Sequence, residues 1–391
     1  CGQAWTHEMS VQSGQWQVKL PYPKKQETAM IWLDNPSDLT HFLQTHANAR
    51  LIGMDTEFIR ERTYYPQLAL VQIVIGDDIA LIDASKPKVA ALLKPLLENP
   101  DVLKIMHSCS EDLQAFKAGC NAVPTPVFDT QTAASLCGLG ASLSYLKLVE
   151  QLCGVTLEKG ETRSDWLQRP LTESQQHYAA DDVRYILPMH AQLAERLQLL
   201  QRREWLDADC ARAVASAADE QPEANPHLAI RSNQPLDAEA QLRLRRILQW
   251  RDARAIERNK PKRWIIDNDA AFALARTELA SVDDIDAIFA RYPKAPKSAR
   301  QHLFALLQKP FDDEERGAPL AREPDAATKA RLKALQQAVL AKAQELAVPE
   351  GLLCSRKHLE FLLETGEWPV ALQGWRQTLL AESFKPILAS A

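Results

Sequence analysis

The chain lacks the features that mark secreted, membrane-spanning and zinc-thiolate proteins. Its seven cysteines, at positions 1, 109, 120, 137, 153, 210 and 354, form no C-x-x-C pair and no zinc-ligand spacing. No run of about 18 uncharged apolar residues occurs, so we expect no segment that crosses a membrane. No charged stretch followed by an apolar core opens the chain, so we expect no secretory signal. Scattered thiols of this kind favour a reduced, cytoplasmic protein.

An excess of positive charge is also missing. The 46 Lys and Arg residues are outnumbered by 51 Asp and Glu residues, which gives a formal net charge of −5. Any binding of nucleic acid must therefore rest on local basic patches. The apolar fraction of 46% is ordinary for a soluble protein, and 391 residues suffice for two or three domains. Composition leaves the function open, so the motifs must indicate it.

Two carboxylates stand inside an apolar run that extends from Leu51 to Phe58 and is typical of a buried β-strand. Asp55 and Glu57 are two residues apart, so their side chains share one face of this strand. They repel each other and lose hydration, which calls for a compensating cation, and a divalent metal ion is the natural candidate. The alternative is a strand end at which both acids simply meet water.

A third carboxylate, Asp112, follows the predicted strand 102–106. It stands in the first turn of a predicted helix, at the carboxyl edge of the sheet where open α/β folds bind ligands. Taken alone, Asp112 is better explained as a charge that the helix dipole stabilises than as a metal ligand.

The next helix opens with a T-x-x-Q capping box at Thr172 and carries Tyr178 and Asp182 at i and i+4. His177 precedes the tyrosine, so either Tyr178 or His177 could be the residue that acts together with Asp182. On a helix, side chains at i and i+4 lie about 40° apart, whereas those at i and i+5 lie about 140° apart. We therefore expect Tyr178 to face the acidic site and His177 to lie on the surface.

Four carboxylates, at 55, 57, 112 and 182, suit two Mg²⁺ or Mn²⁺ ions. Two such ions can stabilise both the attacking and the leaving oxygen of phosphodiester cleavage. The combination of Asp-Thr-Glu (55–57), Ser-Glu-Asp-Leu (110–113) and Tyr-x-x-x-Asp (178–182) resembles the DEDD superfamily of 3′→5′ exonucleases. Residues 55–68 resemble, within it, the bacterial ribonuclease D family, and the likeness spans about residues 30–200.

This resemblance implies an α/β exonuclease domain of the RNase H-like type, with a mixed sheet and flanking helices. It implies that Asp55, Glu57, Asp112 and Asp182 ligate two divalent ions, and that Tyr178 orients the attacking water. The implied reaction is hydrolysis of RNA from a free 3′ end, with release of 5′-mononucleotides. The implied partners are tRNA precursors, and we expect no obligate protein partner. A DNA 3′→5′ exonuclease and a non-catalytic nucleic-acid-binding protein on the same fold remain alternatives.

Residues near the acidic motifs are candidates for substrate contacts. Arg60 and Tyr64 follow the acidic strand, where a guanidinium group and a ring can hold phosphate and stack on a terminal base. His107 precedes the second motif and is a third candidate. The alternative for this loop is a turn at Tyr65-Pro66 that packs against the core.

The second half of the chain is predicted to be helical throughout. A basic amphipathic helix over 242–260 includes Arg251, Arg254 and Lys260, which we predict to form an RNA-binding surface, although such a charge run is often just a solvated face. With Pro261 and Trp264 behind it, this helix resembles the HRDC domain. A related pattern recurs at Pro349, an offset of 349 − 261 = 88, and indicates a second, diverged copy.

Four parts are therefore predicted. Residues 1–27 form a poorly ordered extension and 28–200 the exonuclease domain. Residues 201–310 form a first HRDC-like helical domain that includes a connector at 216–235, and 311–391 form the second.

Overall fold

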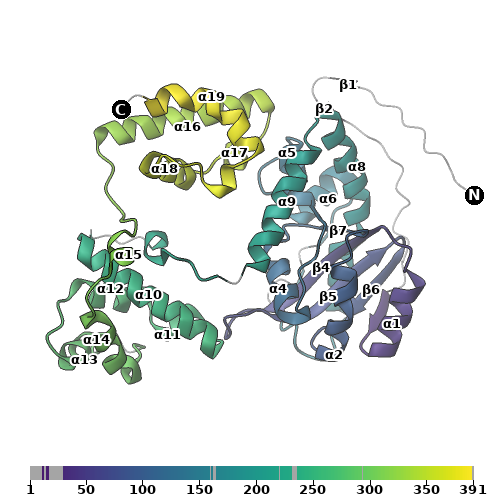
Figure 1. The fold of residues 1–391 in the computed structure, drawn as a ribbon. Helices are drawn as coiled ribbons and strands as arrows, with labels where there is room; N and C mark the ends of the chain where they lie inside the picture. Colours follow the sequence, from purple (N-terminus) through teal and green to yellow (C-terminus); the bar gives the residue numbers. More distant parts are fainter. Residues whose placement is uncertain are drawn as a thin grey trace, which may run out of the picture.

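The computed structural model describes residues 30–158, 160–161, 164–219, 221–230, 236–292 and 294–389, and the backbone of two short paired strands, β1 (Val11–Gln12) and β2 (Gln15–Trp16). The prediction that residues 1–27 form a poorly ordered extension otherwise concerns residues outside the described ranges. One α/β body and two helical bodies make up the described chain (Figure 1). Among the described helices, none is long and apolar enough to cross a bilayer.

The α/β body is built on a six-stranded mixed sheet with the strand order β3-β6-β5-β4-β7-β8. Strand β5 is antiparallel to both of its neighbours, β4 and β6, so β5 and β6 form a hairpin beside the acidic strand. The outer strands pair in parallel with their neighbours. The strands are β3 (Met30–Leu33), β4 (Leu51–Ile59), β5 (Gln67–Ile75), β6 (Asp78–Ile82), β7 (Leu103–Met106) and β8 (Val127–Asp129).

Helices cover this sheet and complete the predicted exonuclease architecture (Figure 1). The predicted capping box at Thr172 starts α7, which ends at Arg184 before α8 begins at Ile186. The helices of this body are α1 (Pro36–Thr45), α2 (Pro87–Ala90), α3 (Lys94–Leu97), α4 (Ser110–Cys120), α5 (Thr130–Leu136), α6 (Tyr145–Cys153), α7 (Glu173–Arg184), α8 (Ile186–Leu199) and α9 (Arg203–Ala218).

The exonuclease body extends past the predicted boundary at residue 200. Helix α9 returns across the body, and its buried residues Leu206 and Cys210 belong to the same apolar core as the sheet. The backbone N–H of Asp129 on β8 donates to the Cys210 sulfur at 3.4 Å. Helix α9 therefore packs as part of the exonuclease body, because its buried apolar residues lie in the core of the sheet.

The two helical bodies repeat each other at the predicted offset. Helices α10 (Ala238–Arg258), α11 (Lys262–Ile265) and α12 (Asn268–Arg276) each begin 88 residues before α16 (Ala326–Leu346), α17 (Glu350–Leu353) and α18 (Arg356–Thr365), as 326 − 238, 350 − 262 and 356 − 268 show. Both long helices are capped by aspartate, Asp237 and Asp325. The first body adds α13 (Val282–Phe289) and α14 (Arg300–Gln308), and the second adds α19 (Trp375–Ala389). Each body has an apolar core of its own.

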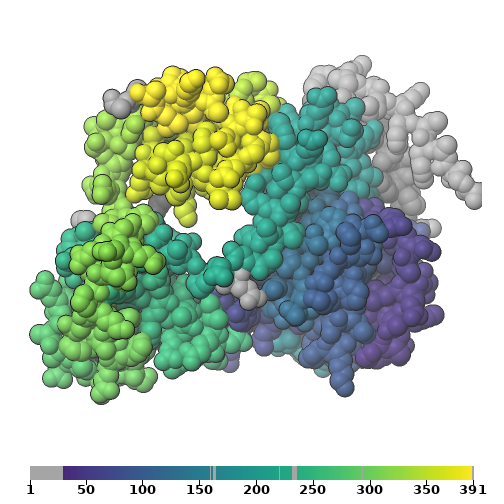
Figure 2. Space-filling view, in the orientation of Figure 1, coloured from purple at the N-terminus to yellow at the C-terminus, as the bar shows by residue number. Residues whose placement is uncertain are grey.

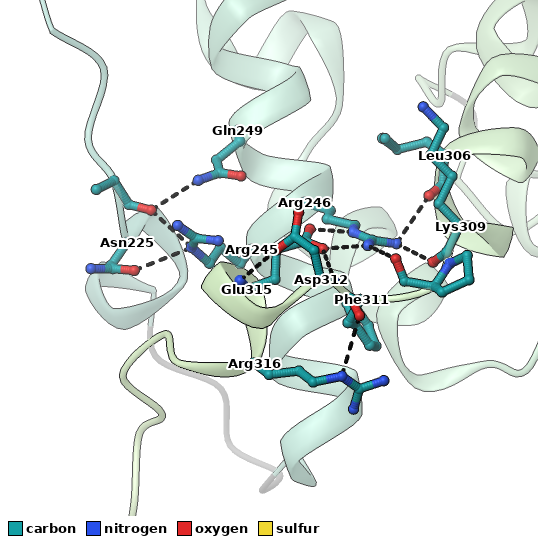
Figure 3. A network of polar contacts seen from close by, with 12 residues as sticks. Asn225, Arg245, Arg246, Gln249, Leu306, Lys309, Phe311, Asp312, Glu315 and Arg316 are labelled. Atoms are coloured by element: carbon teal, nitrogen blue, oxygen red, sulfur yellow. Dashed lines mark hydrogen bonds and ion pairs between the residues drawn. The ribbon is translucent and has the colours of Figure 1, made fainter.

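The acidic connector between the helical bodies is bound to the first of them. It contains α15 (Asp313–Arg316), whose Glu315 forms an ion pair with Arg246 of α10 (Figure 3). Arg246 also donates to the carbonyl oxygens of Lys309 and Pro310, at 2.5 and 2.7 Å. Arg246 is therefore a structural clamp within the basic helix, and the segment after residue 311 begins as part of the first body.

The three bodies surround an opening that is visible in the space-filling view (Figure 2). The second helical body is attached to α9, where the Arg376 guanidinium forms two hydrogen bonds of 2.6 Å with the Asp209 carboxylate. Beside this pair the rings of Trp205 and Trp375 stack with centroids 4.6 Å apart. The first helical body meets the exonuclease body at the end of α10.

Candidate active site

Strand β4 presents its acidic residues between two layers of helices. Gly53 shares a face with Asp55 and Glu57, and a Cβ at Gly53 would lie 2.1 Å from Ile186 of α8. Glycine at this position lets α8 approach the acidic face closely. On the opposite face, the Thr56 hydroxyl donates to the Asp112 carboxylate of α4. The strand thereby joins the acidic motif of β4 to that of α4.

Three of the four predicted carboxylates form one compact group. Asp55, Glu57 and Asp182 each offer an oxygen, and these oxygens all lie within 4.8 Å of one another. Asp112 stands beside this trio, close enough for its charge to act on Asp55 and Glu57. Hard divalent cations prefer such oxygen ligands. The donor set therefore fits a divalent metal centre.

Burial and mutual repulsion disfavour the charged forms of these acids. Burial first, and then the charges of its acidic neighbours, raise the pKa of Asp55 well above its usual range, and that of Glu57 to about 9. Burial also raises the pKa of Asp112 and of Asp182 to about 7. In Asp112 the hydrogen bond from Thr56 opposes this rise. Acids that resist ionisation until a cation arrives are typical of a metal site.

Tyr178 lies on the acidic side of α7, as the helical spacing predicts. Its hydroxyl lies close enough to Asp182 for each group to affect the pKa of the other, and its ring lies 6.0 Å from the ring of Trp166. Burial, together with the charges of Asp182, Glu57 and Asp55, raises the pKa of this phenol above its ordinary value. The group therefore stays protonated at neutral pH. His177 is exposed on the other side of the helix.

Two further residues shape this site without belonging to its motifs. A Cβ at Gly160 would lie 2.2 Å from Cδ2 of Tyr178, so the glycine leaves room for the phenol ring. The Tyr145 hydroxyl donates to the Asp181 carbonyl at 3.0 Å and accepts from the Tyr185 N–H at 3.2 Å, which fixes the end of α7 beside Asp182. The partners of Tyr145 are 36 and 40 residues away in the sequence. No local pattern could therefore have revealed its role.

His107 makes hydrogen bonds within the exonuclease body. Its Nδ1 hydrogen-bonds the Thr130 hydroxyl at 2.9 Å, and its Nε2 hydrogen-bonds the Leu143 carbonyl at 3.1 Å. Burial lowers the pKa of this imidazole. Both ring nitrogens therefore have hydrogen-bond partners within the fold, and the contact of His107 with substrate stays a prediction. Through these bonds His107 connects α5 to the loop before α6.

Arg60 and Tyr64 lie where the exonuclease body meets the first helical body. Arg60 is exposed, and its guanidinium donates to the Tyr64 carbonyl at 3.1 Å and to the Gln114 side chain at 2.9 Å. The ammonium of Lys262 lies 5.9 Å from the centroid of the Tyr64 ring. Both residues thus make protein contacts in the loop that follows β4, and their predicted roles toward substrate stay predictions.

One of the three residues predicted to form a basic RNA-binding surface on α10 is buried. Arg251 is only 6% exposed and donates to Asn268 at 2.8 Å and to Asp252 at 3.2 Å, so it supports the helical core and its placement on an RNA-binding surface is corrected. Arg254 keeps about a third of its side chain exposed, and Lys260 is exposed. The basic side chains of this helix thus fall into two groups, buried ones that make contacts within the protein and a smaller number that are exposed to solvent.

Comparisons with known proteins agree with this architecture. A family of 3′–5′ exonucleases matches residues 30–198. Ribonuclease D of Xanthomonas oryzae pv. oryzae is 47% identical over 360 residues, which are 92% of this chain and 99% of that protein. Ribonuclease D of Escherichia coli K12 is 32% identical over 356 residues, which are 86% of this chain and 92% of that protein.

A solved structure extends the likeness to the helical half. The crystal structure of Escherichia coli RNase D, described as an exoribonuclease involved in structured RNA processing, matches with a TM-score of 0.75 and 27% sequence identity. The match covers 92% of this chain and 98% of that chain. The catalytic core of RRP6 from Trypanosoma brucei shares the fold, with a TM-score of 0.55 and 22% identity.

Proposed function

The chain belongs to the ribonuclease D family and is a 3′→5′ exoribonuclease, and we propose that it trims 3′ extensions of structured RNA with two divalent ions held by four carboxylates. The observation that carries this proposal is the convergence of Asp55, Glu57 and Asp182 within 4.8 Å, with Asp112 beside them. Membership of this family decides against the two alternatives, a DNA exonuclease and a non-catalytic binding protein.

The proposed ligands are the four carboxylates, and the proposed ions are Mg²⁺ or Mn²⁺. When bound, the ions supply positive charge at the scissile phosphate and make the attacking water more acidic. Four negative charges match two divalent cations, which supports two ions rather than one. The raised pKa values of these acids mean that a cation must replace protons when it binds.

Tyr178 is the proposed orienting group for the attacking water. Its hydroxyl lies at Asp182, so it is held at the edge of the acidic trio. Because its pKa is raised, the phenol acts as a neutral hydrogen-bonding group and not as the base that deprotonates the water. Trp166 and Gly160 hold the ring in this place.

The proposed substrates are tRNA precursors in the cytoplasm, bound through a free 3′ end and without an obligate protein partner. The relative from Escherichia coli is described as acting in structured RNA processing, which supports this substrate class. The two helical bodies are proposed to be HRDC-like RNA-binding domains. In the first, Arg254 and Arg258 line a small cavity of about 120 Å³ with Trp264, whose 58% exposure suits stacking on a base.

The direct test is digestion of a 3′-extended tRNA with Mg²⁺ and with a chelator. We expect stepwise shortening with release of 5′-mononucleotides, complete loss of shortening in chelator, and loss in Asp182→Asn. Matched single-stranded RNA and DNA oligonucleotides of one sequence measure the preference for RNA. Shortening that persists in chelator would contradict the proposed metal centre, and an intact 3′ extension would contradict the proposed substrate.

A further inference from the structure

The loop from Arg60 to Pro66 connects the metal-site strand to two other parts of the molecule. Through Arg60 it is bonded at 2.9 Å to Gln114, which lies on α4 two residues beyond Asp112. Arg60 also holds the loop itself, because its Nε donates to the Tyr64 carbonyl at 3.1 Å. The loop therefore links β4 and α4, the two elements on which the first two acidic motifs stand.

The first helical body grips the same loop from outside. The backbone N–H groups of Tyr64 and Tyr65 both donate to Oδ1 of Asn259, at 3.0 and 3.1 Å. The ammonium of Lys262 adds its contact with the Tyr64 ring and is itself fixed by Asp252 at 2.6 Å. The ribbon view shows this loop reaching from the sheet to the end of α10 and α11 (Figure 1).

Asn259 stands at a position that is well suited to hold its side chain rigidly. It is the left-handed cap of α10, with φ of 47°, and its own N–H donates to the Ile256 carbonyl at 3.1 Å. Glycine is the usual residue here, and asparagine is among the few others that adopt this conformation without large strain. The 21-residue helix α10 is thus capped by Asn259, whose side-chain oxygen accepts hydrogen bonds from two backbone N–H groups of the loop after β4.

The second helical body provides an internal comparison. Ala347 lies 88 residues after Asn259 and is the left-handed cap of α16, with φ of 52°. This end of α16 also touches the exonuclease body, but through its backbone: Arg202 donates to the Leu346 carbonyl at 2.7 Å. The two bodies therefore dock with the same structural position, and the cap side chain of the first reaches the loop that leaves the catalytic strand.

We propose that Asn259 is a positioning residue of the exonuclease reaction. By accepting from both loop amides it fixes the loop of residues 60–66, and with it the relative placement of β4 and α4, so that the first helical body completes the active site in addition to its proposed binding of RNA. This inference rests on the proposed roles of the acidic residues. Displacing catalytic groups by about 1 Å can cost about 10²-fold in rate, so a contact remote from the chemistry can govern turnover.

The test compares two substitutions of Asn259 on a trinucleotide RNA, which needs little of the helical surface. Asn259→Gly keeps the left-handed cap and removes the acceptor, whereas Asn259→Asp keeps an oxygen for both amides. We expect kcat to fall about tenfold in Asn259→Gly with KM nearly unchanged, and to return to within about twofold of the original in Asn259→Asp. Ala347→Gly is the matched control at the equivalent cap, and we expect its kcat to equal that of the unaltered protein.

Two further readouts separate this proposal from the metal-site proposal. Added Mg²⁺ should raise the melting temperature of Asn259→Gly as much as that of the unaltered protein, because the ligands remain. If Asn259→Gly keeps full kcat on the trinucleotide and only raises KM for a 3′-extended tRNA, Asn259 merely attaches an RNA-binding body and the proposal is wrong. Equal losses in the Gly and Asp variants would also overturn it. Failure of the unaltered protein to cleave with Mg²⁺ would instead overturn the proposed metal centre.

Discussion

A buried tyrosine beside a carboxylate has a narrow range of chemical roles. The pKa of Tyr178 is raised above its ordinary value by burial and by three acidic neighbours, so the group cannot serve as a base near neutral pH. What Tyr178 can contribute to the reaction is a hydroxyl group placed beside Asp182. The residue-scale predictions therefore concern where this hydroxyl lies and how the acids around it bind protons and metal.

Removal of the hydroxyl in Tyr178→Phe should lower kcat strongly, by about 10²- to 10³-fold, because the attacking water loses its orienting partner. The carboxylates are untouched, so the Mg²⁺-dependent rise in melting temperature should persist. Steady-state cleavage of an RNA oligonucleotide and thermal unfolding measure the two effects. His177→Ala, at the adjacent exposed position, is the control and should keep the original kcat. An unchanged kcat in Tyr178→Phe would refute the orienting role.

Gly160→Ala should also lower kcat, by about tenfold, because its Cβ would overlap Cδ2 of Tyr178 and push the phenol away from Asp182. Metal binding should again survive. Gly351→Ala adds the same methyl group where no atom lies within 4 Å, so it should leave kcat unchanged. Equal rates in both variants would show that the Tyr178 ring can move aside without loss.

The raised pKa values predict how the stability of the folded protein depends on pH, and the sign follows from the number of protons bound in the folded and unfolded states. In the metal-free folded state Glu57 has a pKa of about 9, and Asp112 and Asp182 have pKa values of about 7, against about 4 when unfolded. The folded state thus binds more protons between these limits, and these groups oppose folding increasingly as the pH rises through that window. Mg²⁺ needs the ionised acids, so it should raise the melting temperature more at about pH 8 than at about pH 6.

Thermal unfolding with and without Mg²⁺ at both pH values checks this prediction. The difference between the two melting temperatures is the useful quantity, because other titrating groups affect both curves alike. Asp55→Asn removes one of the proposed ligands and one of the repelling charges, so it should reduce the difference at the higher pH. A Mg²⁺ effect of equal size at both pH values would contradict the assignment of these acids as ligands.

At the scale of elements, α9 holds the second helical body to the exonuclease body. Asp209 and Arg376 are each about 10% exposed in their side chains, so removing one partner strands a buried charge. We expect Asp209→Ala to lower the free energy of unfolding by about 3–5 kcal/mol, as measured by chemical denaturation. On the same helix Asp207 pairs with Arg203 at the surface, and Asp207→Ala should change that free energy by less than about 1 kcal/mol. Similar effects in both variants would contradict a buried interdomain pair.

The elements themselves were largely predictable from sequence. The alternation of β4, the hairpin of β5 and β6, and the capping box of α7 depend on residues within a few positions of one another. The helical repeat was visible for the same reason, since a proline and an apolar pattern recur at one offset. The packing of α9 could not be predicted locally, because its core contacts are with β8, which lies about 80 residues earlier in the chain.

At the scale of the whole molecule, three bodies enclose an opening, and each helical body touches the exonuclease body through the end of its long helix. Arg246 and Arg251 illustrate what such an assembly hides. Both belong to a helix that reads as basic, yet one clamps the acidic connector and the other supports the helical core. Charge in sequence does not distinguish a phosphate-binding arginine from one that satisfies buried carbonyl groups.

By itself the sequence indicated which acids converge, that Tyr178 rather than His177 faces them, that helical parts follow the α/β part, and the family. Each of these depends on local spacing or on a motif whose members keep their order along the chain. Tertiary structure alone decided that His107 and Arg251 are satisfied inside the protein, that Tyr145 and Gly160 shape the site, and that Asn259 meets the loop after β4. These facts depend on partners as far as 195 residues apart, and pairings over such distances are fixed by packing rather than by any local pattern.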